Sequence, residues 1–209
     1  MPAPRPSRRA GIFVQIAKLL ASAVLAHASQ IHAADLEAAK AKAQACIACH
    51  GEQAVSSMAN IPSLAGQPDG FIQWQLVYFR SKTRTNDIMG PIASTLKDAD
   101  IRDLGAYFSS LPPPPPVTDA DSDPQRFARG ATVAQANRCS NCHGETYAGQ
   151  QAIARIAHQR EDYLLKALRD FHEGRRSGGG MAAMPDAVYH LSDEDLQALA
   201  HYLSRFKQP

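Results

Sequence analysis

The chain has 209 residues, of which 44% are hydrophobic and 20% are charged, and its formal net charge is +2. These values are ordinary for a soluble globular protein, and the length allows one large domain or two small ones. Once the basic N-terminal segment 1–33 is set aside, 18 basic residues face 20 acidic ones, a net charge of about −2. That balance argues against a general nucleic-acid binder, which would keep a basic stripe in the folded chain.

Residues 1–33 have the pattern of a secretory signal peptide. Three arginines before residue 10 precede the apolar run GIFVQIAKLLASAVLA, and small-residue cleavage sites follow at AHA (26–28) and IHA (31–33). The run is short, and Gln15 and Lys18 interrupt it, unlike a membrane span. We therefore expect a cleaved signal and export to the periplasm, with an uncleaved anchor or a disordered tail as the alternative.

The remaining elements, in chain order, are helices. The segment 34–45 runs into CIACH, and the middle helix of the first unit places Phe71, Ile72, Leu76 and Phe79 on one face. The second unit repeats this stripe with Tyr163, Leu164, Leu168 and Phe171, and its last helix has Leu196, Leu199, Leu203 and Phe206 on one side. Five prolines open a linker at 112–123, because they cannot continue a helix. A second unit then begins with Asp123 as cap and Pro124 as the first helical residue, and ends in a helix with a capping-box pattern at Ser192 and Asp195. No stretch alternates long enough for a convincing strand, so the predicted fold class is all-α.

The two units are copies of each other. Segment 63–84 aligns with 155–176 at an offset of 92, CIACHGE with CSNCHGE at 93, and 96–111 with 191–206 at 95. Small loop insertions account for the differences between these offsets. We therefore predict a first domain at 34–111, a Pro-rich linker at 112–123 and a second domain at 124–209.

Each copy carries a Cys-x-x-Cys-His motif, and together they use every cysteine of the chain: Cys46, Cys49 and His50; Cys139, Cys142 and His143. A redox dithiol would need a βαβ setting that is not visible, and a zinc site would have to join pairs 93 residues apart. A disulfide within each pair would close a strained two-residue loop. Haem attachment explains the adjacent histidine as well, because two thioethers hold the porphyrin and the imidazole then ligates the iron. We favour two covalent haem c groups, with zinc or structural disulfides as alternatives.

The second axial ligand is predicted by the repeat. Met89 and Met184 each lie seven residues before the leucine that opens the last helix of their unit, and a thioether is a suitable soft ligand for iron. The predicted iron ligands are therefore His50 with Met89 and His143 with Met184, and Met181 is the reserve for the second haem. The remaining histidines (158, 172, 190 and 201) have no counterparts in the first unit, so we interpret them as surface or core histidines, with bis-histidine ligation as a minor alternative.

Both halves resemble class I cytochrome c domains, and the tandem is similar to the dihaem cytochrome c4 family of bacterial periplasms. The resemblance rests on CIACHGE, CSNCHGE, the LAGQ segment with the helix ending in FRSKTR, IMGPIASTLKDADIRDLGAYFSSL and MAAMPDAVYHLSDEDLQALAHYLSRF, which cover nearly the whole mature chain. It implies two all-α haem domains with His/Met ligation that face each other across a pseudo-twofold interface, and it supports the four cysteines as thioether sites. It also implies that the Pro62 carbonyl accepts a hydrogen bond from the first haem histidine. The second unit has Ala154 at that position, so the resemblance does not extend this contact to His143.

The resemblance implies a periplasmic carrier of single electrons towards a terminal oxidase or reductase, with no substrate chemistry of its own. The expected partners are redox proteins, with peripheral membrane association allowed for and no nucleic acid. The alternative is the electron-transfer subunit of a flavocytochrome sulfide dehydrogenase or of a thiosulfate- or alcohol-oxidising complex. A peroxidase would need one iron with an open face, which the matched methionines disfavour.

Overall fold

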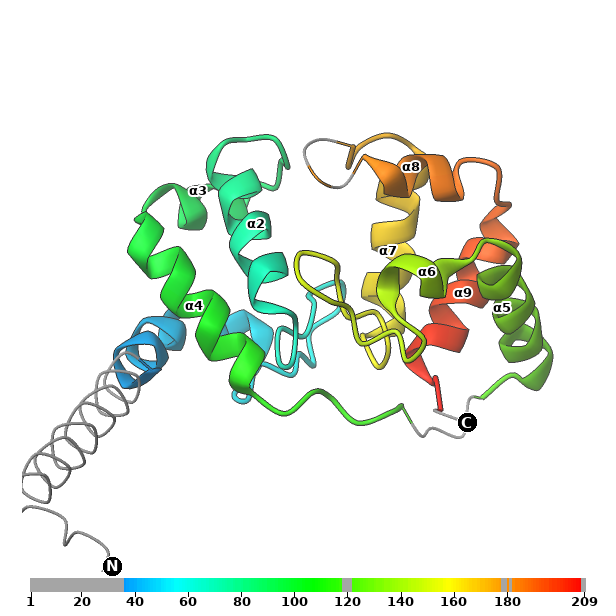
Figure 1. Cartoon of the computed structure of the whole chain (residues 1–209), viewed down its shortest axis with the longest axis horizontal. Coiled ribbons are helices and arrows are strands. Elements are labelled where there is room, and N and C mark those ends of the chain that lie inside the picture. Colours follow the sequence, from blue (N-terminus) through cyan, green and yellow to red (C-terminus); the bar gives the residue numbers. More distant parts are fainter. Residues whose placement is uncertain (1–35, 118–121, 178–179, 181, 208–209) are drawn as a thin grey trace, which may run out of the picture. The chain divides into compact units, whose positions relative to one another are not determined.

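The computed structural model describes residues 36–117, 122–177, 180 and 182–207 (Figure 1). The predicted signal peptide lies outside the described residues. In the first half, residues 36–50 are helical, and α2 (Asp69–Arg80), α3 (Met89–Ser94) and α4 (Asp98–Ser110) follow. The second half contains α5 (Pro124–Ala136), α6 (Cys139–His143), α7 (Glu161–His172), α8 (Ala183–Val188) and α9 (Asp193–Ser204). The one β feature of the described residues is an isolated bridge between Gln150 and Ile153, so the predicted all-α fold is confirmed.

Local sequence signals explain where α5 and α9 of the second half begin. The Asp123 side chain accepts hydrogen bonds from the backbone N–H groups of Gln125 and Arg126, and Pro124 occupies the first position, where no N–H is needed. Ser192 and Asp195 form the reciprocal capping box that starts α9. Both predicted caps are therefore present.

Each half has its own apolar core, built from the predicted stripes. In the first half, Ala43 of the first helix, Ile72 of α2, and Leu104 and Phe108 of α4 form one buried cluster. The larger cluster of the second half includes the predicted stripes of α7 and α9 (Leu164, Leu168 and Phe171; Leu196, Leu199, Leu203 and Phe206). Burial of these side chains is the main favourable contribution to folding.

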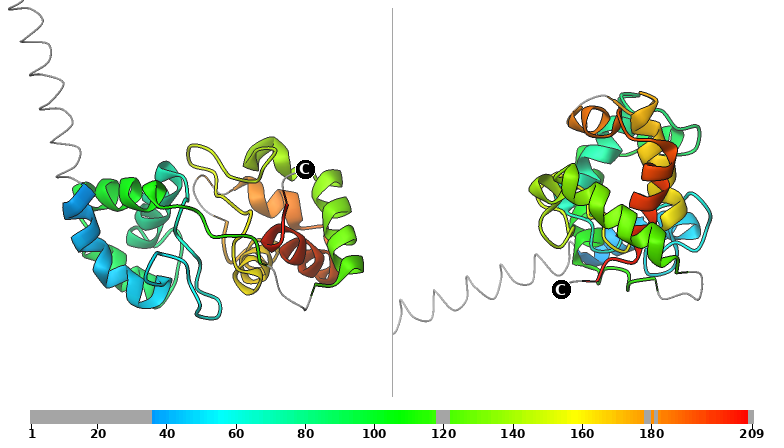
Figure 2. Two further views of the ribbon diagram at one scale, coloured as in Figure 1. Left: turned by 90° about the horizontal axis from the view of Figure 1, so that it is seen from below. Right: turned by 90° about the vertical axis from the view of Figure 1, so that its right-hand side faces the viewer.

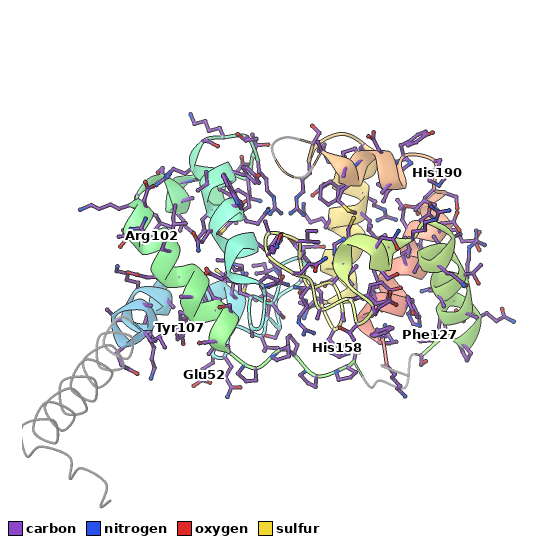
Figure 3. All side chains as sticks on the ribbon, in the orientation of Figure 1. Glu52, Arg102, Tyr107, Phe127, His158 and His190 are labelled. Carbon is purple, nitrogen blue, oxygen red and sulfur yellow. The ribbon has the colours of Figure 1, made fainter. Side chains whose placement is uncertain are left out.

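Small residues allow the first helix of each half to pack closely on the last. Ala39 and Ala43 are buried in the first half, and Gly130 and Ala134 are buried in α5, each pair four residues apart. Figure 2 shows α5 beside α9, and Gly130 lies where an added Cβ would stand 2.1 Å from the carbonyl oxygen of Ala198. Further along the same contact, Phe127 of α5 meets the ring of Tyr202 edge-on, with centroids 5.0 Å apart (Figure 3).

The halves differ in how the first helix reaches its cysteine motif. The prediction that it runs directly into the motif is right for the first half, where the helix continues through residue 50. In the second half α5 ends at Ala136, Arg138 adopts a left-handed conformation (φ 53°), and α6 restarts at Cys139. The reason is spacing: Cys46 follows the buried Ala43 by three residues, whereas Cys139 follows Ala134 by five. The two extra residues cannot be absorbed in a continuous helix without rotating the motif.

The described part of the linker, residues 112–117, has neither helix nor strand and lies against the second half. Pro114 is buried, and its carbonyl oxygen is 3.2 Å from Nδ1 of His158. The N–H of Val117 donates to the carbonyl of Ser204. These contacts tie the proline segment to the end of α9. Among the described residues, no helix is both long and apolar enough to cross a membrane.

The close contact between α5 and α9 predicts that Gly130→Ala destabilises the protein, although alanine is the better helix former. The added methyl group must push α9 away, which should lower the free energy of unfolding by roughly 1–3 kcal/mol. Urea unfolding of the holoprotein, followed by far-UV circular dichroism, measures this. Gln135→Ala, on the exposed side of the same helix, is the control and should change stability by about 0.5 kcal/mol or less. Equal stability of the two variants would show that the crossing does not require glycine.

Candidate functional site

The first Cys-x-x-Cys-His motif ends the N-terminal helix of the first half. Cys46 packs against the apolar core, and burial raises the pKa of its thiol. His50, at the last helical position, is 7% exposed. Gly51 then leaves the helix with φ 90°, where a side chain would collide with the backbone of Val55. The motif therefore presents a half-buried thiol and a buried imidazole at a sharply ended helix.

The second motif is α6 itself. Cys139 packs against the core of the second half, and burial raises its thiol pKa as it does for the equivalent Cys46. His143 is 8% exposed, and Gly144 ends the helix with φ 80°. Despite the break before α6, the first cysteine and the histidine of the second motif are thus placed as in the first, whereas Cys142 is exposed and Cys49 is half-buried.

The backbone holds both histidines through Nδ1. Nδ1 of His50 lies 2.8 Å from the carbonyl oxygen of Pro62, and Nδ1 of His143 lies 2.8 Å from that of Ala154. The contact that the resemblance implies for Pro62 is confirmed, and Ala154, for which it implied none, makes the same contact because the acceptor is the backbone carbonyl. A carbonyl can only accept, so Nδ1 carries the proton and the lone pair of Nε2 is left for a metal.

Burial keeps these imidazoles in the form that binds metal. Removal from water lowers the pKa of His50 and of His143, and the hydrogen bonds to the two carbonyls only partly oppose this. Both rings are therefore neutral at physiological pH, as an iron ligand must be.

The cysteines of the two motifs stay separate. The described residues contain no disulfide between these cysteines, and no group of three or more His, Cys, Asp or Glu side chains that could hold a metal ion. A zinc site shared between the motifs would require such a group. Two independent sites, each with two thiols and one imidazole, fit covalent haem attachment instead.

The methionines paired by the repeat both occur at the beginning of short helices that the sequence did not predict. Met89 is the first residue of α3, and its N–H donates to Oδ1 of Asn86, which fixes the turn before it. Met184 is the second residue of α8 and packs against the core of the second half. Met58 lies in a loop and is 46% exposed. The reserve ligand Met181 lies outside the described residues.

The other four histidines have the surface or structural surroundings expected from the sequence. His201 is buried, accepts from the N–H of Asp123 and contacts Glu161, while both ring nitrogens of His158 face backbone carbonyls. His172 and His190 are exposed, and Figure 3 shows His190 well apart from His158.

Sequence analysis missed a cationic cluster contributed by both halves. Arg84 and Arg176, equivalent in the repeat, each stack on the phenylalanine five residues earlier, 4.5 Å from the ring centroid. Both guanidinium groups donate to Oε1 of Gln75, and Arg84 also donates to the hydroxyl of Tyr163. The matching FRSKTR and FHEGRR segments were the available signal, but arginines near the end of a helix ordinarily indicate only an exposed surface.

The charges of this cluster change the acid–base behaviour of its members. Burial, together with the charge of Arg84, lowers the pKa of Arg176 to about 10. Burial alone would raise the pKa of Tyr163, but Arg84 and Arg176 outweigh it and bring the value to about 8. Beside it lies a pocket of about 170 Å³, lined by four cationic side chains, the carboxylate of Asp170, Thr85 and Asn86. The region is therefore positively charged and suited to an anionic group.

Comparisons with known proteins agree with this geometry. A family model described as cytochrome c matches residues 36–112 and 127–207. A cytochrome c4 from Thiocapsa roseopersicina is 33% identical over 83% of this chain and 94% of its own. A thiosulfate dehydrogenase electron acceptor from Thiomonas intermedia is 30% identical over 92% of each chain. The crystal structure of reduced recombinant cytochrome c4 from Pseudomonas stutzeri matches with a TM-score of 0.72 and 28% identity, over 81% of this chain and 97% of that one.

The two cytochrome c matches, each with one Cys-x-x-Cys-His motif, indicate two covalently attached haem c groups. The side chains fit the group: each motif has a core-facing thiol for a thioether, and each histidine is neutral with Nδ1 already bonded. This agreement holds in both repeats.

Because the histidine acceptors are backbone carbonyls, Pro62→Ala should leave the haem spectra unchanged. The carbonyl remains, as it does naturally at Ala154. Because alanine gives the unfolded chain more conformational freedom than proline does, the free energy of unfolding should fall by about 1 kcal/mol or less. Visible spectra of the oxidised and reduced protein check this. A high-spin component in the variant would show that the proline ring itself is required.

Proposed function

Since the chain belongs to the dihaem cytochrome c4 family and is an electron-transfer cytochrome, we propose that it is a periplasmic carrier that passes single electrons towards a terminal oxidase or reductase. The observation that carries this proposal is the duplicated arrangement of a buried neutral histidine after a cysteine pair, with a methionine at the same place in each repeat. Two similar sites in one chain suit a carrier better than a catalyst, which would need an iron position open to substrate.

We assign Cys46 and Cys49 in the first half, and Cys139 and Cys142 in the second, as the thioether sites. Nε2 of His50 and the thioether of Met89 would hold the iron in the first half, and Nε2 of His143 and the thioether of Met184 would hold it in the second. Haem supplies the one-electron Fe(III)/Fe(II) couple. The chain fixes the imidazole tautomer through the Pro62 and Ala154 carbonyls, and burial around the motif excludes water.

The cationic cluster supports the same assignment. Haem carries two propionate groups, which are anionic at neutral pH, and the guanidinium groups of Arg84 and Arg176 would balance that charge. We therefore include the two arginines among the residues that hold the haems. Export to the periplasm is supported by the signal-like segment 1–33, and membrane-bound redox complexes are the expected partners.

A second candidate function is electron acceptance from a thiosulfate dehydrogenase. Two relatives carry that description, and one of them aligns along 92% of this chain. In this role the chain would still perform no substrate chemistry, and the difference would lie in its electron donor. The fold cannot separate the two roles, because it is shared by both groups of relatives.

The methionine assignment predicts selective effects of Met89→Ala and Met184→Ala. Each variant should lose one of the two contributions to the methionine-to-iron absorption band and convert one haem to a high-spin or differently ligated form. Spectra of the oxidised protein, together with intact mass to confirm two haems, provide the measurement. Met58→Ala, in an exposed loop, is the control and should keep both contributions. A Met184 variant that keeps both would contradict the assignment.

Electron-transfer kinetics distinguish the two proposed functions. In the first role, the reduced protein should be reoxidised by oxidase-containing membranes, with matching oxygen consumption. In the second, thiosulfate and a purified thiosulfate dehydrogenase should reduce both haems at a rate that rises with enzyme concentration. Reduction by the dehydrogenase without any reoxidation by membranes would replace our first proposal with the second.

A further inference from the structure

Two buried glutamines reach from one half of the chain to the other in a symmetric exchange. Gln67 donates through Nε2 to the carbonyl of Arg155 (2.9 Å), and its Oε1 accepts from the N–H of Arg155 (3.0 Å). Gln159 donates to the carbonyl of Ser63 (2.8 Å) and accepts from the N–H of Ser63 (2.8 Å). Gln67 and Gln159 are equivalent in the repeat, and so are Ser63 and Arg155.

The hydrogen bonds of Gln67 and Gln159 are buried and use both ends of each side-chain amide. The two glutamines are 4% and 5% exposed, so water cannot readily replace a lost partner. A carboxamide has one acceptor oxygen and a donor nitrogen, which lets it pair with the N–H and C=O of a single residue. Each broken pair would leave buried polar groups without a hydrogen-bond partner.

The peptide held by each glutamine also holds the haem histidine of the other half. The N–H of Ser63 and the carbonyl of Pro62 belong to one planar peptide group. Its N–H bonds to Oε1 of Gln159, and its oxygen bonds to Nδ1 of His50.

The second half repeats this arrangement in reverse. The peptide group formed by the carbonyl of Ala154 and the N–H of Arg155 lies between Nδ1 of His143 and Oε1 of Gln67. Each histidine is thus connected through one rigid peptide group to a glutamine of the opposite half.

We propose that Gln67 and Gln159 are crossed positioning residues, each setting the hydrogen bond of the haem histidine in the opposite repeat. This inference rests on the ligand roles of His50 and His143 given above. An acceptor on the N–H polarises the peptide and strengthens its carbonyl as an acceptor. The histidine then becomes a more electron-rich ligand, which favours Fe(III) and lowers the reduction potential. Gln159 therefore lowers the potential of the first haem, and Gln67 lowers that of the second.

The test uses Gln67→Met and Gln159→Met in the full holoprotein. Methionine has a similar length and keeps apolar contacts but cannot make the paired hydrogen bonds. Gln73→Met and Gln197→Met are matched controls, because each of these amides bonds only an aspartate four residues earlier on its own helix in an exposed position. Two readouts are needed: both midpoint potentials from a spectroelectrochemical titration, and haem-methyl NMR shifts of the oxidised protein, assigned to each repeat through NOE contacts.

The expected result is a crossed pattern. Gln159→Met should raise the potential and move the methyl shifts of the first haem, Gln67→Met should do so for the second haem, and the controls should change neither. An effect on the haem of the glutamine's own half, an equal effect on both haems, or no effect would each overturn the proposal. An equal effect would show that the glutamines only hold the halves together. Failure of the ligand assignment is recognised separately, because the unmodified protein would then lack two low-spin His/Met spectra.

Discussion

One peptide group in each half carries the hydrogen bond on which the proposed haem site depends. The carbonyl of Pro62 or Ala154 accepts from the Nδ1 of a buried histidine, and this single contact determines which nitrogen is protonated and where Nε2 points. The surrounding loop is held just as firmly. In each half the loop closes back on a residue with positive φ, Ala54 or Tyr147, whose carbonyl accepts two N–H groups of the segment that follows the peptide. Elements far from the motif therefore serve to keep one carbonyl oxygen in place.

Much of the fold could be predicted from the sequence because the signals were local or duplicated. The caps at Asp123 and Ser192 follow from side-chain chemistry within three residues, and the apolar stripes of α7 and α9 follow from helical periodicity. The Cys-x-x-Cys-His motifs were recognisable because their spacing reflects a covalent requirement. Comparing one repeat with the other also separated Met89 and Met184 from the unmatched methionines, which no single-site signal could have done.

The features that could not be predicted depend on tertiary contacts. The resemblance implied the Pro62 carbonyl as an acceptor, but the contact at Ala154 could not be inferred, because the acceptor is a backbone carbonyl and residue type there carries no information about it. The glutamines were aligned as repeat equivalents, but their partners are backbone groups almost a hundred residues away in the chain. Short helices such as α3 and α8, six residues each, lack the length needed for a periodic signal.

The interruption between α5 and α6 shows how a duplicated domain can accept two extra residues directly before its cysteine motif. The N-terminal helical segment of each half must meet two constraints. Its small residues, Ala39 and Ala43 or Gly130 and Ala134, must face the last helix. Its motif histidine must also face the carbonyl that accepts its hydrogen bond. In an unbroken helix, two added residues would rotate the cysteine motif by about 200° about the helix axis, relative to the face that packs on the last helix. The left-handed Arg138 takes up that rotation at a single position. Because the helix is broken at Arg138, the packing of α5 and the position of the cysteine motif can change independently. The length of α5 could therefore vary further in the second half without moving the haem motif.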